Sequence, residues 1–537
     1  MFDEASARVA ILDYRRGVDQ GVAPPQIRTA ELAAALCLAT DLGMGLPLEY
    51  GLKTTLVAMR IADRLDLDAA TRRQAYYVNM LFYGGCTVDA EEQIAYFEEG
   101  ALQYLQPVMF GTPPEGFKPL LQALGAGEGG AVRRTVRAAR KVPGAFRGQK
   151  THLVAMCEVI GLLADSLGLP AEVTGQFPIM TERWDGMSPL RRARGDQVPV
   201  AVHVAHVAHD AAFHAIDRDV GEVARVIGAR SGHAFDPAVA DAFCEAPEDN
   251  LAAAEVDSVW DDVLEVEPAP HHPAPDVDTS LAAFGAFADL VSPHLLGHSS
   301  AVADLAARAG KERGYDEEEM RQVRRAGLIH DLGRVTVPYR VWQNPGALSA
   351  DDWEAVRLHP YHTERALDRS PYLRSLARVA GCHHERLDGT GYHRGMPAAG
   401  LEPEARLLAA ADAYRTKIES RAHRATFSPE AAAAYLRTEA NDGRLDADAV
   451  TAVLTAAGHR PGPIKRPGGL TDREAQTLVL MAEGLATKQI GRKLGVTAKT
   501  ADQYIQRTYA KIGVSTRAAA AVYAMTHGYT TWENSHS

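Results

Sequence analysis

The sequence lacks the features that mark an exported, disulfide-rich or membrane-spanning protein. It begins without a basic and then apolar leader, and it contains no run of about 18 apolar residues. Its five cysteines form no CxxC pair, so neither a disulfide framework nor a zinc knuckle is indicated. Neither a CxxCH nor a GxxxxGK[ST] run occurs, so haem, flavin and nucleoside triphosphate sites have no support. We therefore expect a cytoplasmic protein with no membrane contact.

Sheet-forming runs and large basic regions are also missing. The net charge of −12 excludes a chain that coats nucleic acid along its whole surface, because attraction to phosphate needs clustered Lys and Arg. Any DNA contact must be local. Runs of β-branched and aromatic residues are few, whereas 46% of the residues are hydrophobic, with abundant Ala and Leu. This composition predicts an all-α fold, and a length of 537 residues predicts about three or four folding units.

Two proline-rich segments divide the chain. Residues 265–279 are rich in Pro and acidic residues, and residues 459–469 are rich in Pro, Gly and basic residues, as linkers often are. With these segments as linkers, we predict domains at residues 1–264, 280–458 and 470–537.

The first two predicted domains repeat a common pattern. The hexapeptide ERWDGM, which begins at Glu182, parallels ERLDGT, which begins at Glu385, and similar helical segments follow each. Further upstream the same comparison puts Leu52 at the position of His298, and it puts Phe82 and Tyr83 at those of His330 and Asp331. The pattern predicts an internal duplication whose first copy kept its fold and lost its metal ligands.

The second copy carries seven imidazole and carboxylate groups on segments that we expect to be separate helices or their ends. They are His298, His330, Asp331, His359, His383, His384 and Asp412. Such donors suit Fe, Mn or another first-row divalent metal, whereas structural zinc sites more often use thiolates in shorter spacing. The adjacent His-Asp and His-His pairs would let one helical turn serve two ions, with a carboxylate bridging them, so we predict two divalent ions.

The segments around these groups read GHSSAVA, LIHDLGR, LHPYHTERAL, HHERLDGTGYHRG and ARLLAAADAY, in this order. They resemble the HD-GYP subgroup of HD-domain phosphohydrolases, in which the seven positions hold a two- or three-metal centre. The resemblance implies tandem HD-domain helical bundles, with residues 1–264 as the degenerate copy. It also implies a metal-dependent phosphodiesterase for cyclic di-GMP or a related cyclic dinucleotide, in which a metal-bridging water attacks phosphorus.

The same resemblance implies catalytic roles for Asp331 and Arg334. Arg334 stands where the family has the lysine of its HDxGK motif, and His393 stands where the family has the proline of GYP. A glutamate that supplies a third metal in some members is replaced by His294. These replacements leave a second hypothesis open, in which a catalytically weak or inactive domain senses a ligand or metal and controls DNA binding.

Four other histidines lie close together in the first copy. His203, His206 and His209, with His214 nearby, are spaced for one face of a helix. This spacing is compatible with a metal site and also with a solvated or hydrogen-bonded helix face.

The last 68 residues show a series of short helices. Thr471 and Glu474 form a capping box that begins a first helix, a second is expected over residues 488–494, and Thr497 caps a third that runs to about Ile512. Glycines end the first two helices. Short helices joined by a glycine turn predict a helix-turn-helix.

The third of these helices has the residues of a DNA reader. We expect Ala501, Ile505, Thr508 and Ile512 to form its inward face. The opposite face is polar, and there Gln can contact adenine and Lys or Arg can hold phosphate or guanine. Through LTxRE, AEGL, LGV and AKIGVSTR the segment resembles the LuxR-type (GerE-like) domain, which implies a four-helix domain that binds DNA as a homodimer through its last helix, near residues 518–526. The predicted DNA contacts are Lys488, Lys499, Thr500, Gln503, Gln506, Arg507 and Lys511. The whole chain is therefore predicted to be a transcriptional regulator that carries a phosphodiesterase domain.

Overall fold

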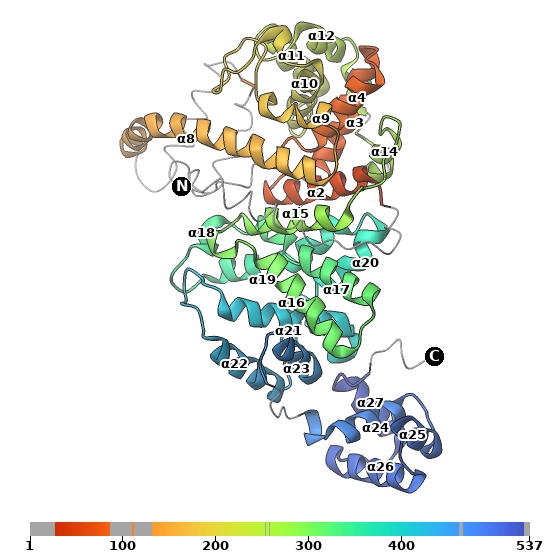
Figure 1. The fold of residues 1–537 in the computed structure, drawn as a ribbon. Helices are drawn as coiled ribbons and strands as arrows, with labels where there is room; N and C mark the ends of the chain where they lie inside the picture. Colours follow the sequence, from red (N-terminus) through yellow and green to blue (C-terminus); the bar gives the residue numbers. More distant parts are fainter. Residues whose placement is uncertain are drawn as a thin grey trace. The chain divides into compact units, whose positions relative to one another are not determined.

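The computed structural model describes residues 27–85, 110–111, 131–252, 254–256, 258–460 and 466–530. Over these ranges the chain is helical and forms isolated bridges but no strand (Figure 1). The all-α prediction is confirmed. None of the helices in the described ranges is long and apolar enough to cross a bilayer. Cys86 and residues 461–465 of the predicted second linker lie outside the described residues.

The chain divides into two compact units. Unit 1 comprises Met1–Pro293, Gly333–Trp342 and Arg365–Tyr372, and unit 2 comprises His294–Leu332, Gln343–Glu364 and Leu373–Ser537. The segments that carry all seven predicted metal ligands belong to unit 2.

The central helix of unit 1 is α10, which packs against α3 and α4. Its Val and Ala side chains are buried on several faces, so neighbouring helices surround it. Aspartate side chains cap several of the surrounding helices, as at Asp68 and Asp219. The helices of unit 1 are α2 (Thr29–Gly43), α3 (Tyr50–Arg64), α4 (Ala69–Met80), α8 (Ala131–Ser166), α9 (Ala171–Thr174), α10 (Val200–His214), α11 (Val220–Arg230), α12 (Pro237–Cys244), α13 (Pro247–Ala252), α14 (Val259–Glu265), α15 (Val277–Asp289) and α18 (Tyr339–Trp342).

The segment predicted as the first linker is held against the start of α2. The backbone N–H of Thr29 donates to the carbonyl of His272 at 3.0 Å, and the N–H of Ala274 donates to the carbonyl of Ile27 at 2.8 Å. The last three residues of the segment already belong to α15, which Asp276 caps. Proline here shapes a packed connection within unit 1.

Unit 2 is built around α16, which packs against α17, α21 and α23. Helices α16 and α17 approach so closely that a Cβ added at Gly327 would lie 2.7 Å from the Cα of Ala303. The helices of the first part are α16 (His298–Arg313), α17 (Glu317–Ile329), α19 (Ala350–Leu367), α20 (Pro371–Ala380), α21 (Pro403–Ile418), α22 (Pro429–Asn441) and α23 (Ala447–Ala456). The 3-10 helix η6 spans Leu332–Thr336, and from Gly333 onward it belongs to unit 1.

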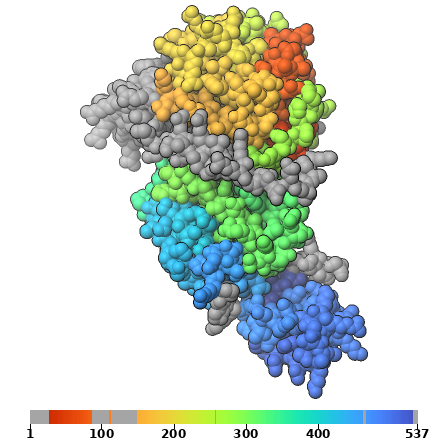
Figure 2. Space-filling view, viewed as in Figure 1, coloured from red at the N-terminus to blue at the C-terminus, as the bar shows by residue number. Residues whose placement is uncertain are grey.

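The chain ends in four helices that share one small core, drawn in dark blue in Figure 2. They are α24 (Asp472–Ala482), α25 (Thr487–Leu494), α26 (Ala498–Ile512) and α27 (Arg517–Thr526). The capping box of Thr471 and Glu474 is present, and the Thr497 side chain accepts from the N–H of Thr500. Both predicted caps are confirmed, and the second helix begins one residue before its predicted start.

Candidate metal centre and DNA-binding helix

The structure brings all seven predicted metal-binding side chains of unit 2 together. His298 begins α16, His330 and Asp331 follow α17, His359 lies in α19, the His383–His384 pair follows α20, and Asp412 lies in α21. Six of the seven are buried, and the side chain of His384 is 12% exposed. Their donor atoms form three overlapping groups in which all atoms lie within 4.8 Å of one another: His359, His383 and His384; His298, His330 and Asp412; and His330, Asp331 and His383.

The carboxylate of Asp331 lies between two pairs of imidazoles. Its Oδ2 is 3.3 Å from Nε2 of His298 and 2.9 Å from Nε2 of His330. Its Oδ1 is 3.2 Å from Nε2 of His359 and 3.3 Å from Nε2 of His383. Each oxygen therefore faces a different pair, which is the arrangement of a carboxylate that bridges two cations.

Three of these histidines have a defined tautomer. Nδ1 of His330, His359 and His383 lies 2.6, 2.6 and 2.7 Å from the backbone carbonyl three residues earlier in the chain. Because a carbonyl only accepts, Nδ1 carries a proton in each ring, and Nε2 is the nitrogen that faces the centre. Nε2 of His359 and Nε2 of His383 are only 3.1 Å apart. Two converging lone pairs beside a carboxylate oxygen form a site that fits a cation.

The pKa shifts of His384 and Asp412 favour the protonation states that metal binding requires. Burial, with the neighbouring charge of His383, holds the pKa of His384 well below its ordinary value. Burial would raise the pKa of Asp412, but hydrogen bonding to His298 and the charge of His384 outweigh burial and hold that pKa well below its usual range. Neutral imidazoles and ionised carboxylates are the forms that bind divalent ions.

The loop that follows the His-His pair is fixed by Glu385. Its Oε1 accepts from the N–H of Arg394 at 3.1 Å, and its Oε2 accepts from the N–H of Met396 at 3.0 Å. This loop places the ring of Tyr392 4.2 Å from that of His384, measured between ring centroids. An aromatic ring therefore lies directly beside the histidine pair.

The predicted catalytic residue Arg334 lies on η6, directly after the His330–Asp331 pair in the sequence. It is only 4% exposed, and its guanidinium carbon lies 5.4 Å from the ring centroid of Trp342. Its burial shows that Arg334 is part of the folded interior.

Sequence reasoning missed Glu419, which follows α21. Its Oε2 lies 2.7 Å from Nδ1 of His298. Burial would raise the pKa of Glu419, but the hydrogen bond and charge of His298 and the charges of Arg421 and Arg415 outweigh burial and lower the pKa to about 2. The only sequence signal was its position seven residues after Asp412.

The corresponding helix in unit 1 begins in the same way, and this changes the predicted register. Helix α3 begins at Tyr50 after Glu49, whose φ is 69°, and α16 begins at His298 after Gly297, whose φ is 76°. Tyr50 precedes Tyr83 by the same interval at which His298 precedes Asp331. Tyr50, and not Leu52, therefore takes the place of His298. Matching glycine to glycine was wrong because Glu49 adopts the left-handed conformation at this helix start.

Aromatic side chains fill the corresponding place in unit 1. Phe82 stacks on His209 with ring centroids 4.5 Å apart, and Tyr83 meets the same imidazole edge-on at 4.9 Å. The hydroxyl of Tyr50 donates to the carbonyl of His209 at 2.8 Å. His209 follows Glu182 by the interval at which Asp412 follows Glu385. Aromatic rings therefore stand at the positions where unit 2 has its candidate metal ligands.

The four histidines of α10 are buried and not solvated. His206 Nε2 lies 2.6 Å from the Met180 carbonyl, and His209 Nε2 lies 3.0 Å from the Asn79 carbonyl. Burial lowers the pKa of His206 to about 3 and that of His209 to about 4. The groups with metal-binding geometry among the described residues do not include these histidines. The hydrogen-bonded alternative holds for His206 and His209.

Helix α26 has the predicted inward stripe and an exposed polar face. It buries Ala501, Ile505, Thr508 and Ile512. Thr500 is partly buried, and its hydroxyl lies 2.9 Å from that of Thr497. Lys511 pairs with Glu474 of the capping box at 2.6 Å. Of the predicted DNA contacts, those exposed to solvent are Lys488, Lys499, Gln503, Gln506, Arg507 and Lys511.

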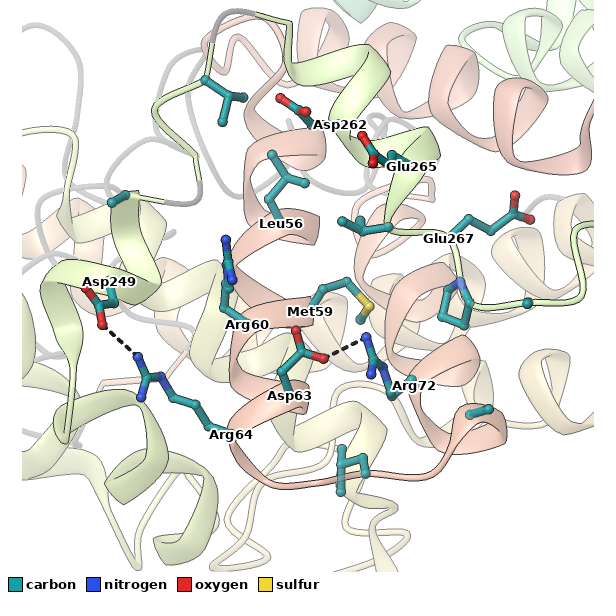
Figure 3. Close-up of a pocket in the computed structure, with 17 residues that line it drawn as sticks. Leu56, Met59, Arg60, Asp63, Arg64, Arg72, Asp249, Asp262, Glu265 and Glu267 are labelled. Carbon is teal, nitrogen blue, oxygen red and sulfur yellow. Dashed lines mark hydrogen bonds and ion pairs between the residues drawn. The ribbon is translucent and has the colours of Figure 1, made fainter.

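Unit 1 also contains a cavity of about 930 Å³, shown in Figure 3. Residues of α3, α4, α13 and α14 contribute to its lining. Two ion pairs lie along its walls, Arg64 with Asp249 at 3.1 Å and Arg72 with Asp63 at 2.6 Å. None of the predicted metal or DNA contacts lines it.

Comparison with known proteins supports two domains. Residues 285–449 match the HD domain family, and residues 469–524 match the bacterial regulatory proteins of the luxR family. The chain therefore contains an HD domain followed by a LuxR-type helix-turn-helix domain. HD domains of this family are metal-dependent, and the histidine and aspartate groups described above could hold a metal ion.

The relatives are HD-GYP phosphodiesterases. The chain is 25% identical to 3'3'-cGAMP-specific phosphodiesterase 3 of Vibrio cholerae serotype O1 over 415 residues, which cover 76% of this chain and 90% of that protein. It is 35% identical over 153 residues to a cyclic di-GMP phosphodiesterase response regulator of Xanthomonas campestris, covering 28% of this chain and 40% of that protein. A crystal structure of a cyclic GMP-AMP-specific phosphodiesterase of Vibrio cholerae shares the fold, with a TM-score of 0.56 and 22% identity over 81% of this chain and 98% of that one. The HD domain is thus similar to the HD domains of cyclic dinucleotide phosphodiesterases.

Proposed function

We propose that the protein hydrolyses a cyclic dinucleotide at a two-metal centre and couples this domain to DNA binding. The observation that carries the proposal is the carboxylate of Asp331, whose two oxygens each face a separate pair of imidazole nitrogens. One ion would bind among His298, His330, Asp331 and Asp412, and the other among Asp331, His359, His383 and His384. Nitrogen and oxygen donors without thiolate favour Fe or Mn.

Divalent ions at such a centre activate water and neutralise charge on a phosphoryl group. The side chains of this chain fix where that chemistry occurs. The backbone carbonyls of Gly327, Val356 and Ala380 hold three imidazoles with Nε2 toward the centre. Tyr392, next to His384, offers an aromatic face on which a nucleobase can stack. Arg334 is proposed to hold a phosphate through its permanent charge.

The substrate class is proposed from the chemistry of the relatives. Their printed names specify 3'3'-cGAMP and cyclic di-GMP, and both are cyclic dinucleotides with two phosphodiester bonds. Because the chain covers 90% of the first relative and 40% of the second, 3'3'-cGAMP is the first nucleotide to test.

The helix-turn-helix domain is proposed to read DNA through α26 and to dimerise through α27. The exposed face of α26 carries Gln503, Gln506 and Arg507, which can reach base edges and phosphates. On α27, Val522 is 58% exposed, which suits a small apolar contact between two copies. A dimer would present two recognition helices to paired half-sites.

A second candidate function keeps the metal centre without efficient turnover. Arg334 carries a planar guanidinium where the family's lysine carries a compact ammonium, and His393 replaces the proline of the GYP loop. In this case nucleotide or metal occupancy, and not hydrolysis, would control DNA binding.

Hydrolysis of 3'3'-cGAMP and cyclic di-GMP by the intact chain, loaded with Mn²⁺ or Fe²⁺, tests these functions. We expect linear dinucleotide from the wild type, none from Asp331→Asn, and normal activity from Asp351→Asn, a control with the same change at an exposed position of α19. Metal binding without hydrolysis of either nucleotide would refute the enzymatic function and favour the sensor.

A further inference from the structure

His298 differs from the other histidines of the centre in how its ring is held. His330, His359 and His383 each place Nδ1 against the backbone carbonyl three residues earlier. His298 is the first residue of α16, and the residue before it is left-handed, with φ 76°. The helix therefore begins at His298 itself, and Nδ1 of this ring faces a side chain.

A carboxylate from a distant part of unit 2 supplies this orientation. Nδ1 of His298 lies 2.7 Å from Oε2 of Glu419, which is 121 residues further along the chain. Nε2 of the same ring lies 3.3 Å from Oδ2 of Asp331 and 3.3 Å from Oδ1 of Asp412. One nitrogen thus points into the centre while the other is held from outside it.

Glu419 is itself held in place on both oxygens. Nε of Arg415 donates to Oε1 at 3.0 Å, and Nη2 of Arg421 donates to Oε2 at 3.2 Å. Arg421 also donates through Nη1 to the carbonyl of His294 at 2.8 Å. The carboxylate directly follows α21, the helix that carries Asp412. The position of the Glu419 carboxylate is therefore linked both to the segment before His298 and to the helix that carries Asp412.

We infer that Glu419 is a positioning residue that orients His298 for one of two metal ions, the ion shared with His330 and Asp412. The inference rests on the proposed metal centre and assigns different outer partners to its two halves. A carboxylate acceptor fixes the proton on Nδ1, as a carbonyl does, and also makes the imidazole a stronger donor to a metal. At the other ion, Nδ1 of His359 and Nδ1 of His383 each face a backbone carbonyl.

Titration of the metal-free full-length chain with Co²⁺ alone, followed by visible absorption, tests this role. We expect two binding steps in the wild type. Glu419→Gln should weaken one step by about 10- to 100-fold, the usual effect of losing an outer partner, and leave the other step unchanged. Glu354→Gln, the same change at an exposed position of α19, should leave both steps unchanged.

The His298→Ala background separates positioning from general destabilisation. If Glu419 acts through His298, Glu419→Gln will have no further effect on Co²⁺ affinity in that background. Should Glu419→Gln fail to fold, as judged by thermal unfolding in EDTA, Arg415→Gln replaces it and should weaken the same step by a smaller factor. Unchanged affinity in the positioning variant, or equal losses in both backgrounds, would overturn the inference.

These outcomes are distinct from failure of the proposed function. A wild-type chain that binds two Co²⁺ ions and hydrolyses no cyclic dinucleotide refutes the enzymatic function, while the titration still decides the role of Glu419. A wild-type chain that binds no Co²⁺ overturns the metal centre and the role of Glu419 together.

Discussion

Replacing Asp331 by asparagine should abolish the stabilisation that divalent metal gives to unit 2. The side chain keeps its shape and loses the negative charge that its two oxygens share between the two imidazole pairs. Without metal the fold should persist, because asparagine keeps the size of the side chain and its amide N–H can donate to an Nε2 of one histidine pair. With metal, neither ion retains its anionic bridge, so both should bind weakly.

The expected size of the effect follows from the two half-sites. An ion at 100 times its dissociation constant stabilises the folded state by about 2.7 kcal/mol, so two ions contribute about 5 kcal/mol, or roughly 10–20 °C in a domain of this size. Differential scanning fluorimetry of the full chain, with Mn²⁺ and with EDTA, measures this shift. We expect the full shift in the wild type and in Asp351→Asn, and less than about a quarter of it in Asp331→Asn. A full shift in Asp331→Asn would refute the bridging geometry.

Three further predictions concern other parts of the chain. Gly327→Ala should lower thermal stability and metal content together, because the added Cβ would lie 2.7 Å from the backbone of the facing helix. Below about pH 6.5 unit 1 should lose stability as pH falls. His206 and His209 stay neutral in the fold, with pKa values of about 3 and 4, while the same residues of the unfolded chain take up protons. Urea unfolding followed by tryptophan fluorescence at pH 7 and pH 5 measures this loss, and equal midpoints would contradict it. Arg507→Ala should weaken DNA binding, measured by fluorescence anisotropy, by about 1 kcal/mol or more without lowering the melting temperature. Lys511→Ala should lower the melting temperature, because it breaks an ion pair with the capping box. The reverse pattern would show that Lys511 contacts DNA and that Arg507 stabilises the fold.

Features set by neighbouring residues could be predicted from the sequence. The capping box at Thr471 and the cap at Thr497 depend on side chains that bond within three residues, so a short pattern determines them. The inward stripe of α26 follows from helical periodicity in the same way. The seven candidate metal ligands could be selected because their donor types are distinctive and recur in the order of a known family.

Features set by distant contacts or by unusual backbone could not be predicted. Glu419 reaches His298 across 121 residues, and no local pattern records that contact. The position of Tyr50 was missed because Glu49 takes a left-handed conformation that sequence reasoning reserves for glycine. Lys511 was predicted to contact DNA, but its ion pair with Glu474 also depends on how α24 and α26 pack.

The aromatic cluster around His209 means that the interiors of the two repeats are completed in different ways. Tyr50, Phe82 and Tyr83 fill their pocket with rings supplied by the chain itself, so that half completes its interior during folding. In the proposed metal centre of the other half, buried imidazoles and carboxylates would be completed by metal ions. On the proposed metal centre, removal of divalent metal should therefore destabilise unit 2 and leave unit 1 unchanged, so that the stability of one half would depend on the metal supply of the cell.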